Sequence, residues 1–113
     1  MRYLLLLHVD ESGWPRLSQA EQAAAMTTYG AYNQALETAG ALVATGRLAP
    51  SAGAVSIRTV GGKPVAMDGP YAETKEQVGG FYLIDAPNRD AALDWATRCP
   101  AAGHGTVEVR EVG

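Results

Sequence analysis

The sequence has a single cysteine, Cys99, among 113 residues. A disulfide bond within the chain is therefore excluded, and a lone thiol favours a reducing compartment, which we expect to be the cytoplasm. Cys99 falls on the apolar stripe of an expected helix, where a free cysteine packs as a small apolar side chain. The chain has only two histidines, far apart, and no recognised spacing of metal ligands. We expect neither a metal site nor a cofactor.

Basic clusters and long apolar runs are also missing. Nine Lys and Arg face twelve Asp and Glu, for a formal net charge of -3, whereas nucleic-acid binding needs a basic face. No apolar run approaches the roughly 20 residues of a membrane span. The apolar run at 3–9 is too short for a signal peptide and has no cleavage site after it. There is also no Gly-rich phosphate loop and no nucleophile elbow. From the charge and the short apolar runs, we expect a protein that contacts neither nucleic acid nor membrane.

What remains is the composition of an ordinary globular protein, with 47% apolar and 19% charged residues. The length suffices for one core without metals or disulfides. We therefore expect a single domain over residues 1–113. Ser18 and Glu21 form a capping-box pattern that starts one helix, and Gly40 is suited to end it. Asn88 caps a second helix, which Pro100 stops.

Residues 54–68 have the pattern of a β-hairpin, with Gly61-Gly62 as a two-residue turn and Pro64 typical of an edge strand. Without it, the expected order is βαββαβ, the ferredoxin-like arrangement. The fold class is therefore α+β, ferredoxin-like with an inserted β-hairpin. The strands at 3–9 and 81–84 would form the inner pair, and both are apolar on both faces. The remaining strands are expected at 41–48 and 106–112.

The first strand predicts a second subunit. Leu5 and Leu7 lie on one face, while Leu4 and Leu6 lie on the other. Two helices cover only one face of such a sheet, and exposed apolar surface costs about 25 cal/mol per Å². Packing sheet against sheet in a twofold homodimer would cover the second face.

The segment 68–77, DGPYAETKEQ, followed by GGFYLI at 79–84, resembles the signature of the DGPF branch of the YCII-related proteins. Tyr71 stands where that branch usually has Phe. The resemblance extends over the whole chain, including Gly46 and the segment GTVEVR at 105–110. It implies a dimeric α/β barrel of ferredoxin-like subunits.

The same resemblance implies a chemistry and a partner. The wider YCII-related group includes a chlorinated-hydroquinone dehydrochlorinase, with an Asp after the first strand and a His in the first helix as the proposed catalytic pair. Asp10 matches that Asp, but Tyr29 or Asn33 stands where the His would be. The DGPF branch resembles proteins encoded beside, or fused to, extracytoplasmic-function sigma factors, which implies association with a sigma factor.

His8, Asp10 and Asp68 are the candidate catalytic residues. His8 and Asp10, two residues apart, would share a strand face, where the carboxylate would orient the imidazole. Asp68 opens a rigid turn and is expected near both, so that two carboxylates would raise the pKa of one. The alternatives are a His bonded to backbone or water and an Asp that only opens its turn.

Tyr29, Tyr82 and Arg47 are the candidate substrate-binding residues. The phenols would line a pocket as donors, or else belong to the core. Arg47 would hold an anionic substrate, or else be an exposed strand arginine. Together these features predict an acid–base enzyme or ligand-binding dimer for a small molecule. The alternative is a regulatory interaction module associated with a sigma factor.

Overall fold

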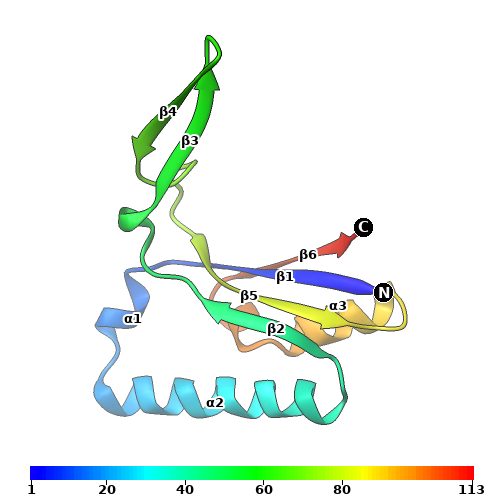
Figure 1. Ribbon diagram of the computed structural model, residues 1–113. Helices are drawn as coiled ribbons and strands as arrows, with labels where there is room; N and C mark the ends of the chain where they lie inside the picture. Colours follow the sequence, from blue (N-terminus) through cyan, green and yellow to red (C-terminus); the bar gives the residue numbers. More distant parts are fainter.

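The computed structural model describes residues 1–113. A four-stranded sheet, two long helices on one side of it and a separate hairpin make up the α+β structure (Figure 1). In chain order the elements are β1 (Arg2–Val9), α1 (Gly13–Arg16), α2 (Gln19–Thr38), β2 (Leu42–Arg47), the 3-10 turn η1 (Ser51–Gly53), β3 (Val55–Val60), β4 (Lys63–Asp68), β5 (Gln77–Asp85), α3 (Arg89–Arg98), the 3-10 turn η2 (Pro100–Gly103) and β6 (Thr106–Val112).

The main sheet has the order β2-β5-β1-β6, and every neighbouring pair is antiparallel. β1 and β5 are therefore the inner strands, as their apolar composition predicts. This order is compatible with a ferredoxin-like α+β fold. The register pairs Leu5 with Tyr82 on β5 and with Val109 on β6. Since side chains alternate between faces, these residues share the face that the helices cover.

The core lies between the sheet and the helices α2 and α3. Its largest fully buried side chains are Leu5, Leu36 and Ile84, and truncating Leu36 to alanine would cost about 2–5 kcal/mol. Cys99 is 2% exposed, which confirms its predicted packing. The buried apolar set comprises Tyr3, Leu5, Leu7, Tyr32, Leu36, Ala41, Tyr82, Ile84, Ala86, Ala92, Ala96, Cys99 and Ala101.

The opposite face of the main sheet also carries large apolar side chains. Leu4 and Leu6 of β1 pair with Leu83 and Phe81 of β5, and all four are only partly buried. The ring of Phe81 lies over Gly46 of β2, so close that a Cβ there would be 2.9 Å from it. Because α2 and α3 both lie on the other side (Figure 1), we call this the open face.

The helix boundaries follow the predicted caps. The Ser18 hydroxyl accepts from the Glu21 amide at 3.1 Å, and the Ser18 amide donates to the Glu21 carboxylate at 2.9 Å. Asn88 caps α3 through the Ala91 amide. Gly40 has a φ of 67° just after α2, the left-handed conformation that ends many helices. None of the helices combines the length and the hydropathy of a membrane-spanning segment.

Strands β3 and β4 pair only with each other, as a two-stranded sheet. Gly61 and Gly62 have φ values of 59° and 80° at its turn, the positive angles that a two-residue hairpin requires. In Figure 1 the hairpin rises from the main sheet, away from α2. Ile57 is 71% exposed. The radius of gyration is 16.0 Å, above the roughly 13 Å of a compact chain of this size, because the hairpin projects.

Candidate functional site

The residues predicted to form one site lie in separate surroundings. The predicted convergence of His8, Asp10 and Asp68 is not what the structure contains. His8 lies on the open face, and Asp10 lies in the loop after β1. Asp68 is exposed at the base of the hairpin, where it pairs with Val55. Tyr29, Tyr82 and Arg47 lie between α2 and the strands β2 and β5.

His8 is paired with Glu108, not with Asp10. Its Nε2 atom lies 2.9 Å from Oε1 of Glu108, on the neighbouring strand β6. The second Glu108 oxygen lies 3.9 Å from the Arg110 guanidinium. Strand alternation does not extend to Asp10, because β1 ends at Val9. The prediction that Asp10 orients this imidazole is therefore wrong.

Asp10 is held by a local turn. Its Oδ1 atom accepts from the Ser12 hydroxyl at 2.6 Å and from the Ser12 amide at 3.0 Å. These two bonds, and then the charges of Lys75 and Arg16, lower the pKa of Asp10. The rise predicted for the pKa of one carboxylate of a pair therefore does not occur at Asp10. Asp68 is exposed and does not line the cavity beside Asp10.

A cavity of 360 Å³ lies beside Asp10, within the usual size range of small-molecule sites, about 300–1,000 Å³. Its walls come from segments far apart in the chain: the loop after β1, the start of η1, and the loop between β4 and β5. Most lining side chains are polar. They are Asp10, Glu11, Ser12, Ser51, Ala52, Pro70, Glu73, Thr74, Lys75 and Gln77.

One wall of this cavity is fixed by Glu11. Its carboxylate oxygens accept from the Ser51 amide at 2.8 Å and from the Ser51 hydroxyl at 2.7 Å. The two bonds hold η1 against the loop after β1. Both Glu11 oxygens are therefore engaged, whereas Asp10 binds Ser12 through Oδ1 alone.

The loop from Gly69 to Glu76 holds its own shape. The Gln77 amide Nε2 donates to the Ala72 carbonyl at 2.7 Å and to the Thr74 carbonyl at 3.2 Å. Oε1 of Glu76 accepts from the Thr106 hydroxyl at 2.9 Å. Much of this polar segment therefore maintains the loop, while Glu73 and Lys75 bring charge to the cavity.

Tyr29, Tyr82 and Arg47 form a second group on the helix side. The Tyr82 hydroxyl donates to Oδ1 of Asn33, and the Tyr29 oxygen lies 3.2 Å from Nε2 of His104. Burial raises the pKa of Tyr82 to about 12. Burial also raises the pKa of Tyr29 to about 12, a rise that the nearby Arg47 charge opposes. The tyrosines therefore remain protonated donors at neutral pH.

The sequence patterns did not reveal Trp14, over whose ring the Arg47 guanidinium lies at 4.8 Å. Trp14 belongs to α1, a four-residue helix with Pro15 inside it, too short for apolar periodicity. Ser12 carried a usable signal, because an Asp two residues before a Ser commonly forms a side-chain turn.

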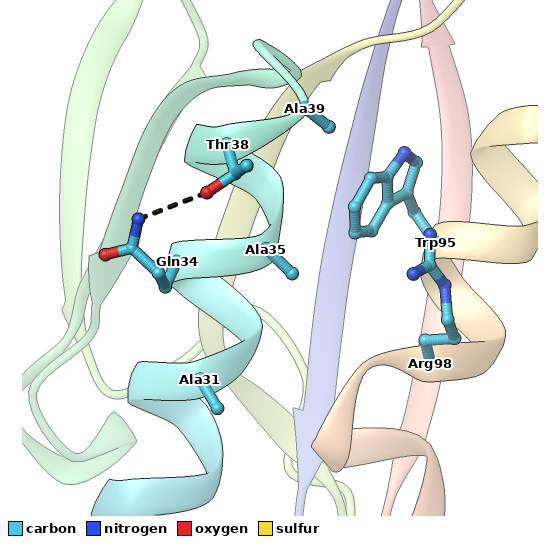
Figure 2. A pocket seen from close by; sticks show the side chains of 7 residues that line it. All are labelled: Ala31, Gln34, Ala35, Thr38, Ala39, Trp95 and Arg98. Carbon is cyan, nitrogen blue, oxygen red and sulfur yellow. Dashed lines mark hydrogen bonds between the residues drawn. The ribbon is translucent and has the colours of Figure 1, made fainter.

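A larger hollow of 630 Å³ lies between α2 and α3 (Figure 2). Small side chains such as Ala31 and Ala35 line its α2 wall. Its polar groups bind one another or their own helix: Gln34 donates to Thr38, and Arg98 pairs with Asp94 and stacks on Trp95. The cavity beside Asp10 is thus the stronger candidate, since its groups converge from different segments. No three His, Cys, Asp or Glu side chains are grouped to hold a metal ion.

The family model of the YCII-related domain matches residues 1–113. The chain belongs to the YCII-related family. A relative from Rhizobium meliloti (strain 1021), itself described as uncharacterized, is 40% identical over 112 residues, which cover 97% of this chain and 90% of the relative. In this YCII-related protein, both the cavity beside Asp10 and the tyrosine group therefore lie within the family match.

Proposed function

We propose that this YCII-related protein binds a small polar molecule in the cavity beside Asp10 and acts in the cytoplasm. The observation that carries the proposal is the convergence of polar side chains from distant segments on a 360 Å³ cavity. The carboxylate of Asp10 would accept a hydrogen bond from a hydroxyl or ammonium group of the ligand. Lys75, on the facing loop, would bind an acceptor atom of the same molecule.

The lowered pKa of Asp10 favours a role in ligand binding over one in proton abstraction. An efficient general base has a pKa near the working pH, whereas the bonds from Ser12 lower the pKa of Asp10. Asp10 would thus remain ionised and orient a donor group. His8 would take no part, because it lies on the open face beside Glu108. An acid–base step would need its proton acceptor on another group of the cavity or on the ligand itself.

We also propose that the protein is a homodimer of the DGPF branch, with its main sheets facing each other in a dimeric barrel. Support comes from the open face, where Leu4, Leu6, Phe81 and Leu83 are only partly buried in the single chain. In this proposal residues 55–68 are an insertion in a ferredoxin-like core.

A second candidate function is a regulatory interaction module that associates with a sigma factor. The observation that favours it is the apolar exposure of the hairpin, where Val55 is 58% and Ile57 71% exposed. A sigma factor that coelutes with wild-type protein, but not with a protein lacking residues 55–68, would support this candidate against the first.

The ligand proposal is tested by ligand-observed NMR with a set of small amino alcohols and hydroxy acids. Asp10→Asn should weaken binding by about tenfold or more, as expected when a charged hydrogen-bond acceptor is neutralised. Glu37→Gln is the matched control, because Glu37 is exposed near the end of α2, away from the cavity lining. Equal affinities of wild type and Asp10→Asn would contradict the proposal.

A further inference from the structure

Arg47 is a fixed cation without an anion. It ends β2, and its guanidinium carbon lies 4.8 Å from the centre of the Trp14 ring. The salt bridges of the chain all involve other cations, namely the amino terminus, His8, Arg98 and Arg110. The indole therefore orients this guanidinium while its hydrogen-bond donors remain available.

The backbone of Trp14 is held by two hydrogen bonds to its carbonyl oxygen. The Gln22 side chain, on the first turns of α2, donates to the Trp14 carbonyl at 3.0 Å, and the Leu17 amide donates to it at 3.1 Å. The Gln22 bond ties α1 to α2, so the backbone from which the indole projects toward Arg47 is preorganised. Preorganisation of this kind lowers the cost of ordering a site when a ligand binds.

The Arg47 charge opposes the rise in the pKa of Tyr29, so these two side chains lie near each other. Tyr29 and Asn33 are four residues apart and so neighbours on one helix face. The Asn33 oxygen is occupied by the Tyr82 hydroxyl, which leaves the amide N–H groups of Asn33 as donors. Glu11, in the loop before Trp14, has both carboxylate oxygens bound to Ser51. The Tyr29 oxygen already lies 3.2 Å from Nε2 of His104, so the free donors of this group are those of Arg47 and Asn33.

We propose that Arg47, stacked on Trp14 and facing the Tyr29 end of α2, binds a small aromatic carboxylate. The planar guanidinium matches a carboxylate with two parallel hydrogen bonds, and the part of the partly buried indole that Arg47 leaves uncovered offers apolar contact to a ring. The site differs from the cavity beside Asp10, whose lining excludes Arg47 and carries more acidic than basic side chains. The Arg47 site would therefore bind an anion, whereas the cavity beside Asp10 is proposed to bind a molecule with hydroxyl or ammonium groups.

The test is a titration of the ¹⁵N-labelled protein with benzoate at fixed ionic strength, followed by NMR. The indole N–H signal of Trp14, identified with Trp14→Phe, should shift together with the backbone amides of Tyr29, Asn33 and Arg47. Arg47→Gln should weaken benzoate binding roughly tenfold, the usual effect of losing a charge-assisted pair of bonds. Arg47→Lys, which keeps the charge and loses the fork, should lie between the two and serves if Arg47→Gln does not fold.

Arg58→Gln is the control, because Arg58 is an exposed arginine on the hairpin, and it should bind benzoate like wild type. Equal affinity in wild type and Arg47→Gln, or equal weakening by Arg58→Gln, would overturn the proposal, the second by revealing a nonspecific charge effect. Asp10→Asn should leave benzoate binding unchanged. The anion site and the cavity beside Asp10 can therefore fail independently of each other.

Discussion

The Nε2 atom of His8 lies 2.9 Å from Oε1 of Glu108, across strands β1 and β6 on the open face of the main sheet. The two side chains are 28% and 44% exposed, and partly exposed pairs contribute at most about 1 kcal/mol. At protein concentrations low enough for monomers, where the open face stays exposed, Glu108→Gln should therefore lower the free energy of unfolding in urea by no more than that amount. It should not change ligand binding beside Asp10. Glu111→Gln, on the same strand, is the control. A loss of ligand binding in Glu108→Gln but not in Glu111→Gln would show that His8 contributes to the ligand site.

The open face predicts association. Wild-type protein should sediment as a homodimer at micromolar concentration, whereas Leu6→Asp should sediment as a folded monomer, because a charge in that interface is not solvated. Leu5→Asp should instead unfold the chain, since Leu5 is fully buried under the helices. Circular dichroism separates the two outcomes. A wild-type protein that is a compact monomer at every concentration would contradict the dimer.

Alkaline pH should destabilise the fold through its tyrosines. Burial raises the pKa of Tyr29 and Tyr82 to about 12 and that of Tyr32 further above its ordinary value, whereas a tyrosine in the unfolded chain titrates near 10. The unfolded state therefore loses these protons first. Their stabilising contribution should be complete below about pH 10 and decline as the pH rises toward 12.

Urea midpoints measured between neutral pH and pH 12 test this decline. Tyr82→Phe should start less stable, because it loses the bond to Asn33, and should decline less steeply above pH 10. Tyr71→Phe is the control, since Tyr71 is 92% exposed. An equal slope in wild type and Tyr82→Phe would show that this buried phenol does not govern the transition.

The hairpin should be dispensable for folding of the core. Residues 55–68 form a two-stranded sheet of their own. At its base the two chain ends are held together by a hydrogen bond of 2.7 Å from the Gly69 amide to the Ala54 carbonyl. Replacing these residues with a short Gly-rich turn should leave cooperative unfolding intact. The measured slope against urea should fall only slightly, because the hairpin buries little surface. Noncooperative melting of the shortened protein would place the hairpin in the core.

The main elements could be predicted because each carries a local signal. The Ser18 and Glu21 box sets the start of α2, the Gly61-Gly62 turn sets the hairpin, and the doubly apolar strands at 3–9 and 81–84 become the inner pair. Signals of this kind depend only on residues close together in the sequence, so a single sequence is enough to predict these elements.

The candidate site was less predictable, because its geometry depends on where elements end. β1 ends at Val9, so the Asp10 carboxylate bonds to Ser12 in the following loop. The His8 imidazole instead pairs with Glu108, which is 100 residues further along the chain. No pattern in the sequence indicates that register. Trp14 was missed for a related reason, since a helix of four residues has no periodicity.

The proposed function requires that a ligand binds in the cavity beside Asp10. The direct measurement is to identify, by mass spectrometry, the small molecule that copurifies with the protein under native conditions, and to map its binding by ¹⁵N NMR. The amides of residues 10–12, 51–52 and 71–77 should shift, and Asp10→Asn should strongly reduce both copurification and these shifts. Shifts confined to the open face or the hairpin, unaffected by Asp10→Asn, would contradict the account.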